Sequence, residues 1–213
     1  IYVFLGGMRS VALTDVLQGI LMFVLMIVAV FTIANSLGGI TAANRAVYEQ
    51  LPELFSRQGV DNFFTKPKWF SYMILWVLCV PMFPQMFMRF YIPKTPTPLK
   101  VSAVLYPLIT TIIFICPVLI GVWAHIPFPN LVGKATDRVL PMMLAEYTPV
   151  WVASFVMVGA LAAFMSTLDS QLLALSSMLT RDVYISYFRP NASLREQTLI
   201  GRVLIVILAI IGL

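Results

Sequence analysis

Charged residues are scarce in this sequence. Only 11% of its 213 residues are charged, whereas 60% are hydrophobic. A soluble domain usually carries about 25% charged residues, and a domain of this size has too small an interior to hide so much apolar surface. The composition therefore excludes an ordinary soluble domain and indicates that the excess apolar side chains lie in a lipid bilayer.

Residues that hold metals or act as nucleophiles are also few. The chain has one histidine and two cysteines. Cys79 and Cys116 lie in separate apolar runs, as small hydrophobic helix residues do, and no CxxC spacing indicates a metal or redox pair. His125 ends an apolar run, which favours a polar tip at a membrane surface. With no glycine-rich phosphate loop either, the sequence predicts neither an enzyme nor a bound cofactor.

Long apolar runs are abundant. A membrane-spanning helix needs about 20 mostly apolar residues, and the predicted spans are 11–35, 69–90, 101–124, 150–180 and 199–213. The fourth is long for one crossing, so it must tilt or extend into water. The chain starts without Met and without a signal peptide, and it stops inside an apolar run. We therefore expect residues 1–213 to form one all-α, polytopic transmembrane helix bundle that is an internal fragment.

The loops between the spans differ in length and charge. Two long connections, 36–68 and 125–149, each contain a candidate short surface helix, with Thr136 as the predicted N-cap of the second. The other connections are short and basic. The basic residues on the short-loop side are Arg9, Arg89, Lys94, Lys100, Arg181, Arg189, Arg195 and Arg202. The positive-inside rule places that side in the cytoplasm of a plasma or inner membrane. This bias explains the net charge of +5 without a nucleic-acid partner.

The fourth span has small and hydroxyl residues where lipid favours leucine. Ala163, Ser166, Thr167 and Ser170 follow the i, i+3, i+4, i+7 spacing of one helical face. Na⁺, like other hard cations, takes oxygen ligands. The hydroxyls of Ser166 and Thr167 and the carbonyl of Ala163 offer three such oxygen ligands. The carbonyl is available because a hydroxyl at 167 can loosen its helix hydrogen bond. The same pattern also lets helices pack closely, which is the alternative interpretation.

Two acids stand near these residues. Asp169 lies in an apolar span, where inserting a charge at the bilayer centre costs about 2.5–3.5 kcal/mol, so we expect it to belong to a functional site. The alternative is a solvent-exposed position near the cytoplasmic end of the helix, since Arg181 follows soon after. Asp15 begins the first span, where an acid complements the helix dipole. Together the two acids could instead line a cation exit path toward the cytoplasm.

The second span is interrupted by proline. Pro81 and Pro84 remove backbone hydrogen bonds in mid-membrane. Transporters use such broken helices to bind substrate near the midplane. Trp76 lies about two turns before Pro84, and Gln85 directly follows it, so these three residues are candidates for the solute side. A plain proline kink is the alternative.

Four blocks carry a family resemblance: GGMRSVALTDVLQG, PQMFMRFY, DRVLPMMLAEYTP and ALAAFMSTLDSQLLALSSMLTRDVY. Their order and spacing, over 6–184, resemble the sodium:solute symporter family, which includes proline, pantothenate, sugar, sialic acid and monocarboxylate symporters. The resemblance implies the leucine-transporter-type fold of two inverted five-helix repeats. The spans would be core helices five to eight and a truncated ninth, and the first core helix would be absent.

The resemblance also implies roles for individual residues. Ala163, Ser166 and Thr167 match the family's sodium site, and Asp15 matches an acid linked to sodium release. Some members have a second sodium site near that acid, whose serines fall at Asp169 and Ser170, so the aspartate departs from the pattern. Trp76 matches a tryptophan on the substrate side of proline-type members. Cys79 stands where sugar carriers have a gate tyrosine, which disfavours a sugar.

The sequence thus predicts sodium-coupled symport of a small organic solute: a monocarboxylate, an amino acid or a pantothenate-like compound. Its partners are Na⁺, the solute and the bilayer. One alternative is a proton-coupled carrier of the same fold, although hydroxyls such as those of Ser166 and Thr167 do not cycle protons near neutral pH. A transporter-like sensor domain of a signalling protein is another. A channel is disfavoured, because no continuous polar stripe is present.

Overall fold

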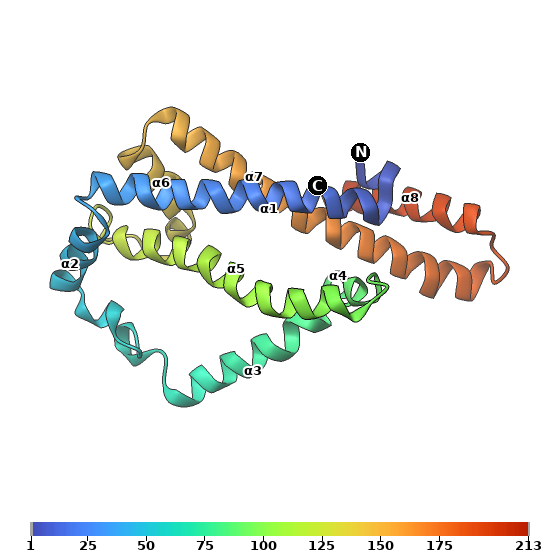
Figure 1. Cartoon of the computed structure of the whole chain (residues 1–213), viewed down its shortest axis with the longest axis horizontal. Coiled ribbons are helices and arrows are strands. Elements are labelled where there is room, and N and C mark those ends of the chain that lie inside the picture. The colour runs from blue at the N-terminus through green and yellow to red at the C-terminus, as the bar shows by residue number, and fades with distance from the viewer. Residues whose placement is uncertain (1, 213) are drawn as a thin grey trace. The chain divides into compact units, whose positions relative to one another are not determined.

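The computed structural model describes residues 2–212, and no strand occurs among them. The α-helices are α1 (Tyr2–Ser36), α2 (Ile40–Gln50), α3 (Lys66–Met82), α4 (Pro84–Phe87), α5 (Pro96–Trp123), α6 (Val139–Tyr147), α7 (Val150–Met178) and α8 (Leu194–Ile211) (Figure 1). Short 3₁₀ helices span Pro52–Phe55, Val60–Asn62, Met88–Tyr91 and Gly133–Arg138, and a π-helix, η5 (Leu179–Phe188), continues α7. The predicted all-α fold is confirmed.

Three helical stretches are long and apolar enough to cross a membrane: Gly6–Ser36, Pro96–Trp123 and Val150–Phe188. The pair Lys66–Met82 and Pro84–Tyr91, bent by 61°, makes a fourth if it is one broken span. The predicted spans overlap these stretches and α8. The helix α8 does not meet the same criteria, since it carries Arg195, Glu196 and Arg202. That each predicted span crosses the bilayer stays a prediction.

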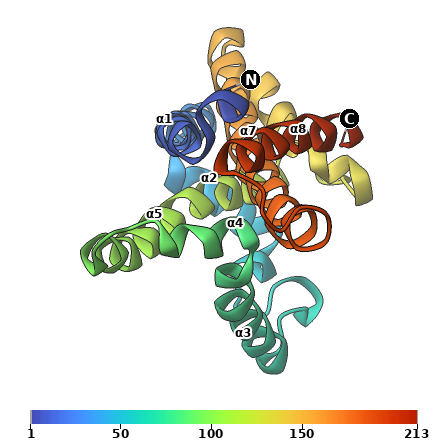
Figure 2. The ribbon, with the colours of Figure 1, turned by 90° about the vertical axis from the view of Figure 1, so that its right-hand side faces the viewer.

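The chain divides into two compact units. The first unit holds Ile1–Gly19, Leu78–Thr95 and Ala162–Leu213, and the second holds Ile20–Val77 and Pro96–Leu161. In the first unit, η5 and α8 lie side by side (Figure 2). Tyr184 donates a hydrogen bond of 2.8 Å to Glu196 between them. Ser193 caps α8 by accepting the backbone N–H of Glu196, so the turn into α8 is stabilised locally.

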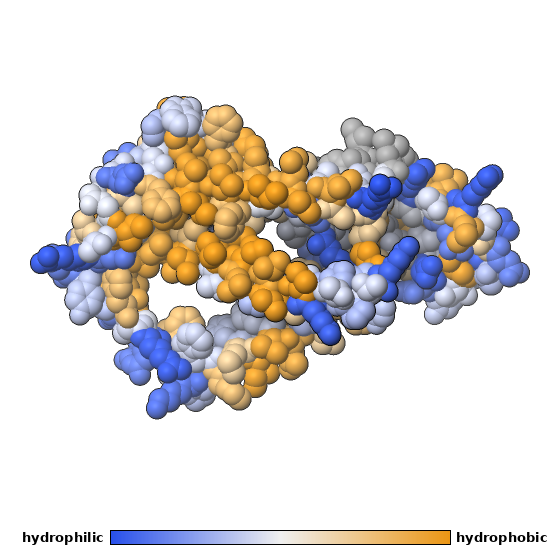
Figure 3. Space-filling view, viewed as in Figure 1, coloured by the Kyte–Doolittle hydropathy of each residue, from blue (hydrophilic) through white to orange (hydrophobic). Residues whose placement is uncertain are grey.

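The second unit has a buried core built from α1, α2, α5, α6 and α7. Trp123 is fully buried there, and its indole Nε1 donates to Asn44 Oδ1 at 2.7 Å. The hydroxyl of Ser36 donates to the carbonyl of Tyr147 at 2.9 Å. Much apolar surface stays exposed along α1 and α5, where Figure 3 shows hydrophobic colour. Such faces are expected on helices that meet lipid or further helices.

The two long connections fold into short helices as predicted: α2 with Pro52–Phe55 in one, and Gly133–Arg138 with α6 in the other. The predicted N-cap at Thr136 is wrong. The hydroxyl of Thr136 donates to the carbonyl of Gly133, and Arg138 is the residue before α6, with no side-chain cap. The segment before α6 is already a 3₁₀ helix, so its N–H groups have backbone partners and do not need the hydroxyl.

The proline-rich helix breaks at Phe83. Pro81 lies inside α3, which ends at Met82, and Pro84 begins α4. Phe83 has φ −59° and ψ 128°, an extended conformation that a following proline favours. Pro84 then occupies the first turn of α4, where its missing N–H is tolerated. The local sequence therefore determines the break, and the segment after it, which contains Arg89, runs at 61° to α3.

Candidate functional site

Asp15 is the centre of a polar cluster inside the first unit. The guanidinium of Arg89 donates through Nη2 to Asp15 Oδ2 at 2.5 Å and to Ser170 Oγ at 2.6 Å. The hydroxyl of Ser166 donates to Asp15 Oδ1 at 2.6 Å, and that of Ser170 lies 3.4 Å from Oδ2. We call Asp15, Arg89, Ser166 and Ser170 the Asp15 cluster. It joins three segments that are distant in the chain.

Each member reaches the cluster for a local reason. Ser166 and Ser170 are four residues apart on α7, so both hydroxyls lie on one helical face. Asp15 lies on α1. Arg89 follows the break at Phe83, in the 3₁₀ turn Met88–Tyr91. The sequence therefore provides one acid, two hydroxyls and one cation on three separate helical elements, and tertiary packing brings them together.

The cluster compensates a charge that is largely withdrawn from water. Only 14% of the Asp15 side chain is exposed, against 38% for Arg89. A carboxylate at this depth requires a counter-charge and hydrogen-bond donors. The guanidinium and the two hydroxyls supply both, in contacts of the strong, charge-assisted kind. Because Arg89 is more than a third exposed, solvent screening reduces the net gain from the pair.

The three residues predicted for the sodium site are not gathered around one point. The hydroxyl of Thr167 donates to the carbonyl of Ala163 at 3.1 Å, so these two groups satisfy each other. Ser166 instead contacts Asp15. Neighbouring helix positions point about 100° apart, so Ser166 and Thr167 present their hydroxyls to different sides of α7. Ser166 is thus the member that connects the predicted hydroxyl pair with the Asp15 cluster.

The other predicted cation residues divide between the cluster and its surroundings. Ser170 is buried, with 8% of its surface exposed, and contacts both Asp15 and Arg89. Asp169 precedes it on α7 and is partly buried. Among residues 2–212, no group of three or more His, Cys, Asp or Glu side chains could hold a metal ion. A carboxylate with hydroxyls suits a hard, oxygen-seeking cation better than a soft transition metal.

The residues predicted for the solute side lie around the helix break. Trp76 is 61% exposed on α3 in the second unit. Pro84 is exposed and Gln85 is partly buried, both in the first unit. Gln85 lines a small cavity of about 10 Å³ together with Arg89 and Ser170. The first unit therefore places one solute-side candidate next to the Asp15 cluster.

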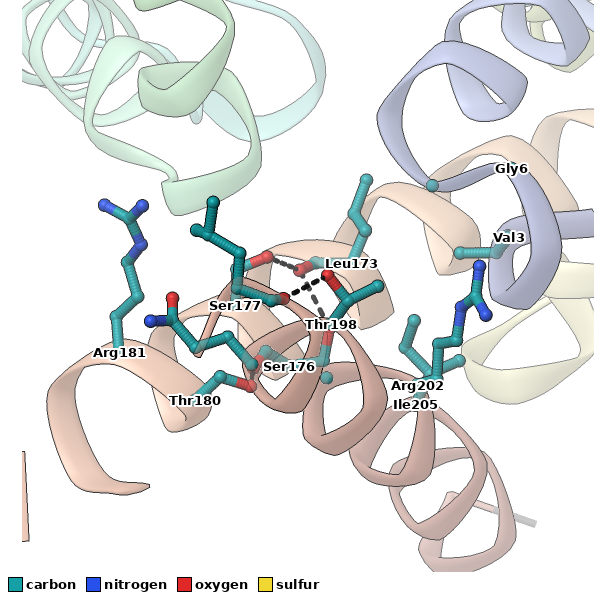
Figure 4. A pocket seen from close by; sticks show the side chains of 14 residues that line it. Val3, Gly6, Leu173, Ser176, Ser177, Thr180, Arg181, Thr198, Arg202 and Ile205 are labelled. Carbon is teal, nitrogen blue, oxygen red and sulfur yellow. Dashed lines mark hydrogen bonds between the residues drawn. The ribbon is translucent and has the colours of Figure 1, made fainter. Parts of the chain in front are cut away.

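A larger cavity of about 430 Å³ lies between the end of α7, α8 and the start of α1. Its polar side chains include Ser176, Ser177, Thr180 and Thr198 (Figure 4). Each of these hydroxyls donates to a carbonyl of its own helix, at 2.7–3.0 Å. Since the hydroxyls are already satisfied, they do not define a ligand.

The family model of the sodium:solute symporter family matches residues 1–213. The chain belongs to this family. The predicted resemblance is therefore confirmed over the whole chain. Family members are symporters rather than enzymes, Na⁺ is their coupling ion, and they are multi-pass membrane proteins.

Several curated relatives align with most of the chain. A sodium/pantothenate symporter of Haemophilus influenzae is 29% identical over 92% of this chain and 40% of its own length. An osmoregulated proline transporter of Bacillus subtilis is 29% identical over 100% of this chain and 43% of its own length. A high-affinity choline transporter of Torpedo marmorata is 30% identical over 96% of this chain and 36% of its own length. The chain thus spans about two fifths of the length of these relatives. No solved structure matches it.

Sequence reasoning missed the role of Arg89. From the sequence, Arg89 counts only as one of the basic residues on the short-loop side and as part of the block PQMFMRFY. A usable signal was present, because Arg89 and Asp15 are opposite charges at the same predicted end of two spans. Charged residues in such positions usually pair with one another. Choosing Asp15 as the partner, rather than Asp169, required the tertiary structure.

Proposed function

We propose that the protein containing this chain is a sodium-coupled symporter of a small organic solute. The observation that carries the proposal is the convergence of Ser166 and Ser170 on Asp15 within apolar helices, in a chain of this family. A carboxylate with hydroxyls is an oxygen-rich set of the kind that hard cations such as Na⁺ take as ligands. The parent protein works in the plasma or inner membrane, with the short basic loops in the cytoplasm.

The proposed sodium ligands on α7 are the carbonyl of Ala163 and the hydroxyls of Ser166 and Thr167. The contact between Thr167 and Ala163 supports this assignment, because it holds the hydroxyl and carbonyl oxygens 3.1 Å apart, and both can face one cation once the hydroxyl hydrogen turns away. A cation here needs further oxygens from another helix, which makes the site sensitive to conformation. Asp15, Asp169 and Ser170 form a second cation site or an exit path toward the cytoplasm.

The proposed solute site uses the break in the second span. Pro81 and Pro84 each lack the N–H that a helix residue donates to a carbonyl of the preceding turn, and broken helices of this kind bind polar solutes in membrane carriers. Trp76, Pro84 and Gln85 are the candidates on this helix. The relatives are named for pantothenate, proline and choline, so the proposed solute is a small, charged or zwitterionic organic molecule. Amino acids and carboxylates are the first classes to test.

Coupling follows from linkage. If Na⁺ and solute both favour the same state of the carrier, each raises the affinity for the other by the same factor. Alternating access then moves one helix group against the other around the bound ligands. A proton-coupled carrier is the competing function, with Asp15 or Asp169 as the proton site. The contacts of Asp15 oppose its use as that site, because its two carboxylate oxygens already accept from Arg89 and Ser166.

The test is uptake into proteoliposomes that hold the full-length protein. Labelled amino acids, carboxylates, choline and sugars are offered under inward Na⁺, K⁺ or H⁺ gradients. We expect uptake to follow the Na⁺ gradient and to be lost in Ser166→Ala/Thr167→Ala. Ser154→Ala is the matched control, since Ser154 is an exposed hydroxyl on α7 that donates only to Val150. Uptake driven by H⁺ and indifferent to Na⁺ contradicts the proposal.

A further inference from the structure

We propose that Arg89 is a tethered cation that competes with Na⁺ for Asp15. This inference rests on the proposed sodium coupling and adds a residue to it. One nitrogen of Arg89, Nη2, contacts both Asp15 Oδ2 and Ser170 Oγ, at 2.5 and 2.6 Å. Those two oxygens are among the ones that a cation at Asp15 would use. The guanidinium therefore occupies the same oxygens that would coordinate the cation.

The chemistry makes the two cations alternatives. Oδ1 of Asp15 accepts from Ser166, and Oδ2 accepts from Arg89. A sodium ion that binds Oδ2 and Ser170 has to displace Nη2, since both cations cannot contact these oxygens without strong repulsion. Ser166 and Ser170 are hydroxyls, which donate to the carboxylate in this state and can turn their lone pairs to a metal ion in the other. Sodium binding thus requires the release of Arg89.

Arg89 is placed so that it can leave. Its side chain is 38% exposed, so the released guanidinium can be hydrated. It stands in the short 3₁₀ turn Met88–Tyr91, after the break at Phe83, and not in the middle of a long helix. The cavity of about 10 Å³ beside Gln85, Arg89 and Ser170 has room for about one water molecule. When Na⁺ departs, the returning guanidinium keeps Asp15 compensated and opposes rebinding.

The rival role for Arg89 is purely structural: an ion pair that holds α1, α7 and the 3₁₀ turn together. The two roles differ in the sign of one effect. If Arg89 only holds the fold, its removal weakens sodium binding or leaves it unchanged. If Arg89 competes, its removal strengthens sodium binding, although the carboxylate has lost a partner.

The experiment measures binding of radioactive sodium to the full-length protein purified in detergent. We expect Arg89→Gln to lower the half-saturating Na⁺ concentration about threefold to fivefold, the effect of removing one partly exposed ion pair. Arg89→Lys keeps the charge and should stay near wild type. Arg9→Gln is the matched control, because Arg9 is exposed on α1 in the same unit.

The outcomes separate the inference from the proposed function. Tighter binding in Arg89→Gln, with Arg9→Gln unchanged, supports competition. If the wild type binds sodium and Arg89→Gln weakens that binding or leaves it unchanged, the competing role of Arg89 is wrong, whereas the proposed symport is not contradicted. If neither the wild type nor Arg89→Gln binds sodium, both the competing role and sodium-coupled symport are contradicted. Should Arg89→Gln not fold, the double variant Asp15→Asn/Arg89→Gln removes both charges, and we expect it to fold and to bind Na⁺ more weakly than wild type; stronger binding there contradicts competition at Asp15.

Discussion

Ser166 and Asp15 are 151 residues apart in the chain, and the hydroxyl of one donates to the carboxylate of the other at 2.6 Å. This contact links α7, which carries the proposed sodium ligands, with the acid on α1. Ser166 has two proposed partners, a sodium ion and Asp15, so occupation of one affects the other. The link explains how a cation at α7 can influence the ion pair between Asp15 and Arg89.

Removal of the charge at Asp15 should weaken sodium dependence. In Asp15→Asn the amide cannot compensate the charge of Arg89, and a cation at the cluster loses the carboxylate of Asp15. We expect the Na⁺ concentration for half-maximal uptake to rise about tenfold or more, the effect of one charge-assisted contact. Uptake in proteoliposomes at graded Na⁺ measures it. Asp61→Asn, at an exposed residue of the 3₁₀ helix Val60–Asn62, should not change that concentration.

Thr167 offers a sharper test of the hydroxyl pair than the double variant. Thr167→Ser keeps an oxygen that can reach the Ala163 carbonyl, whereas Thr167→Val keeps the shape and loses the oxygen. We expect Thr167→Ser to retain Na⁺-driven uptake and Thr167→Val to lose it at low Na⁺. If both variants transport equally, Thr167 serves packing alone. Binding of radioactive sodium to the purified protein shows whether a loss arises from ion binding.

Gly159 should not tolerate a methyl group. A Cβ there would lie 3.0 Å from Leu25 Cδ1 and 3.2 Å from Leu25 Cβ, closer than ordinary contact. Gly121, in α5, has nothing within 4 Å of the same position. Alanine favours a helix over glycine by about 1 kcal/mol. We therefore expect Gly121→Ala to raise the melting temperature in detergent and Gly159→Ala to lower it. A rise in both would mean that α1 and α7 do not pack closely there.

The hydrogen bond between Trp123 and Asn44 should stabilise the second unit. In Asn44→Leu the buried Trp123 Nε1 loses its acceptor. Such an unpaired donor costs about 1–3 kcal/mol, so the melting temperature should fall. Asn35→Leu is a matched change at an exposed position of α1. Equal melting temperatures for both variants would show that water replaces the lost acceptor.

The fold class and the break in the second span follow from local sequence. Long apolar runs have few stable forms in lipid other than helices, because backbone groups must be satisfied internally. Pro84 removes one of those groups and forces the residue before it out of the helical region, and the structure breaks at Phe83. The spacing of Ser166 and Ser170 likewise follows from helical periodicity alone.

Only the tertiary structure decided which charged residues meet. Periodicity places Asp15, Asp169 and Arg89 on helices, but it carries no information about partners 74 or 151 residues away. Packing selected Asp15 as the partner of both Arg89 and Ser166, whereas Thr167 bonds to Ala163 of its own helix. The physical reason is that helix formation is local, whereas a buried charge is compensated by whichever opposite charge the folded chain brings within hydrogen-bond distance.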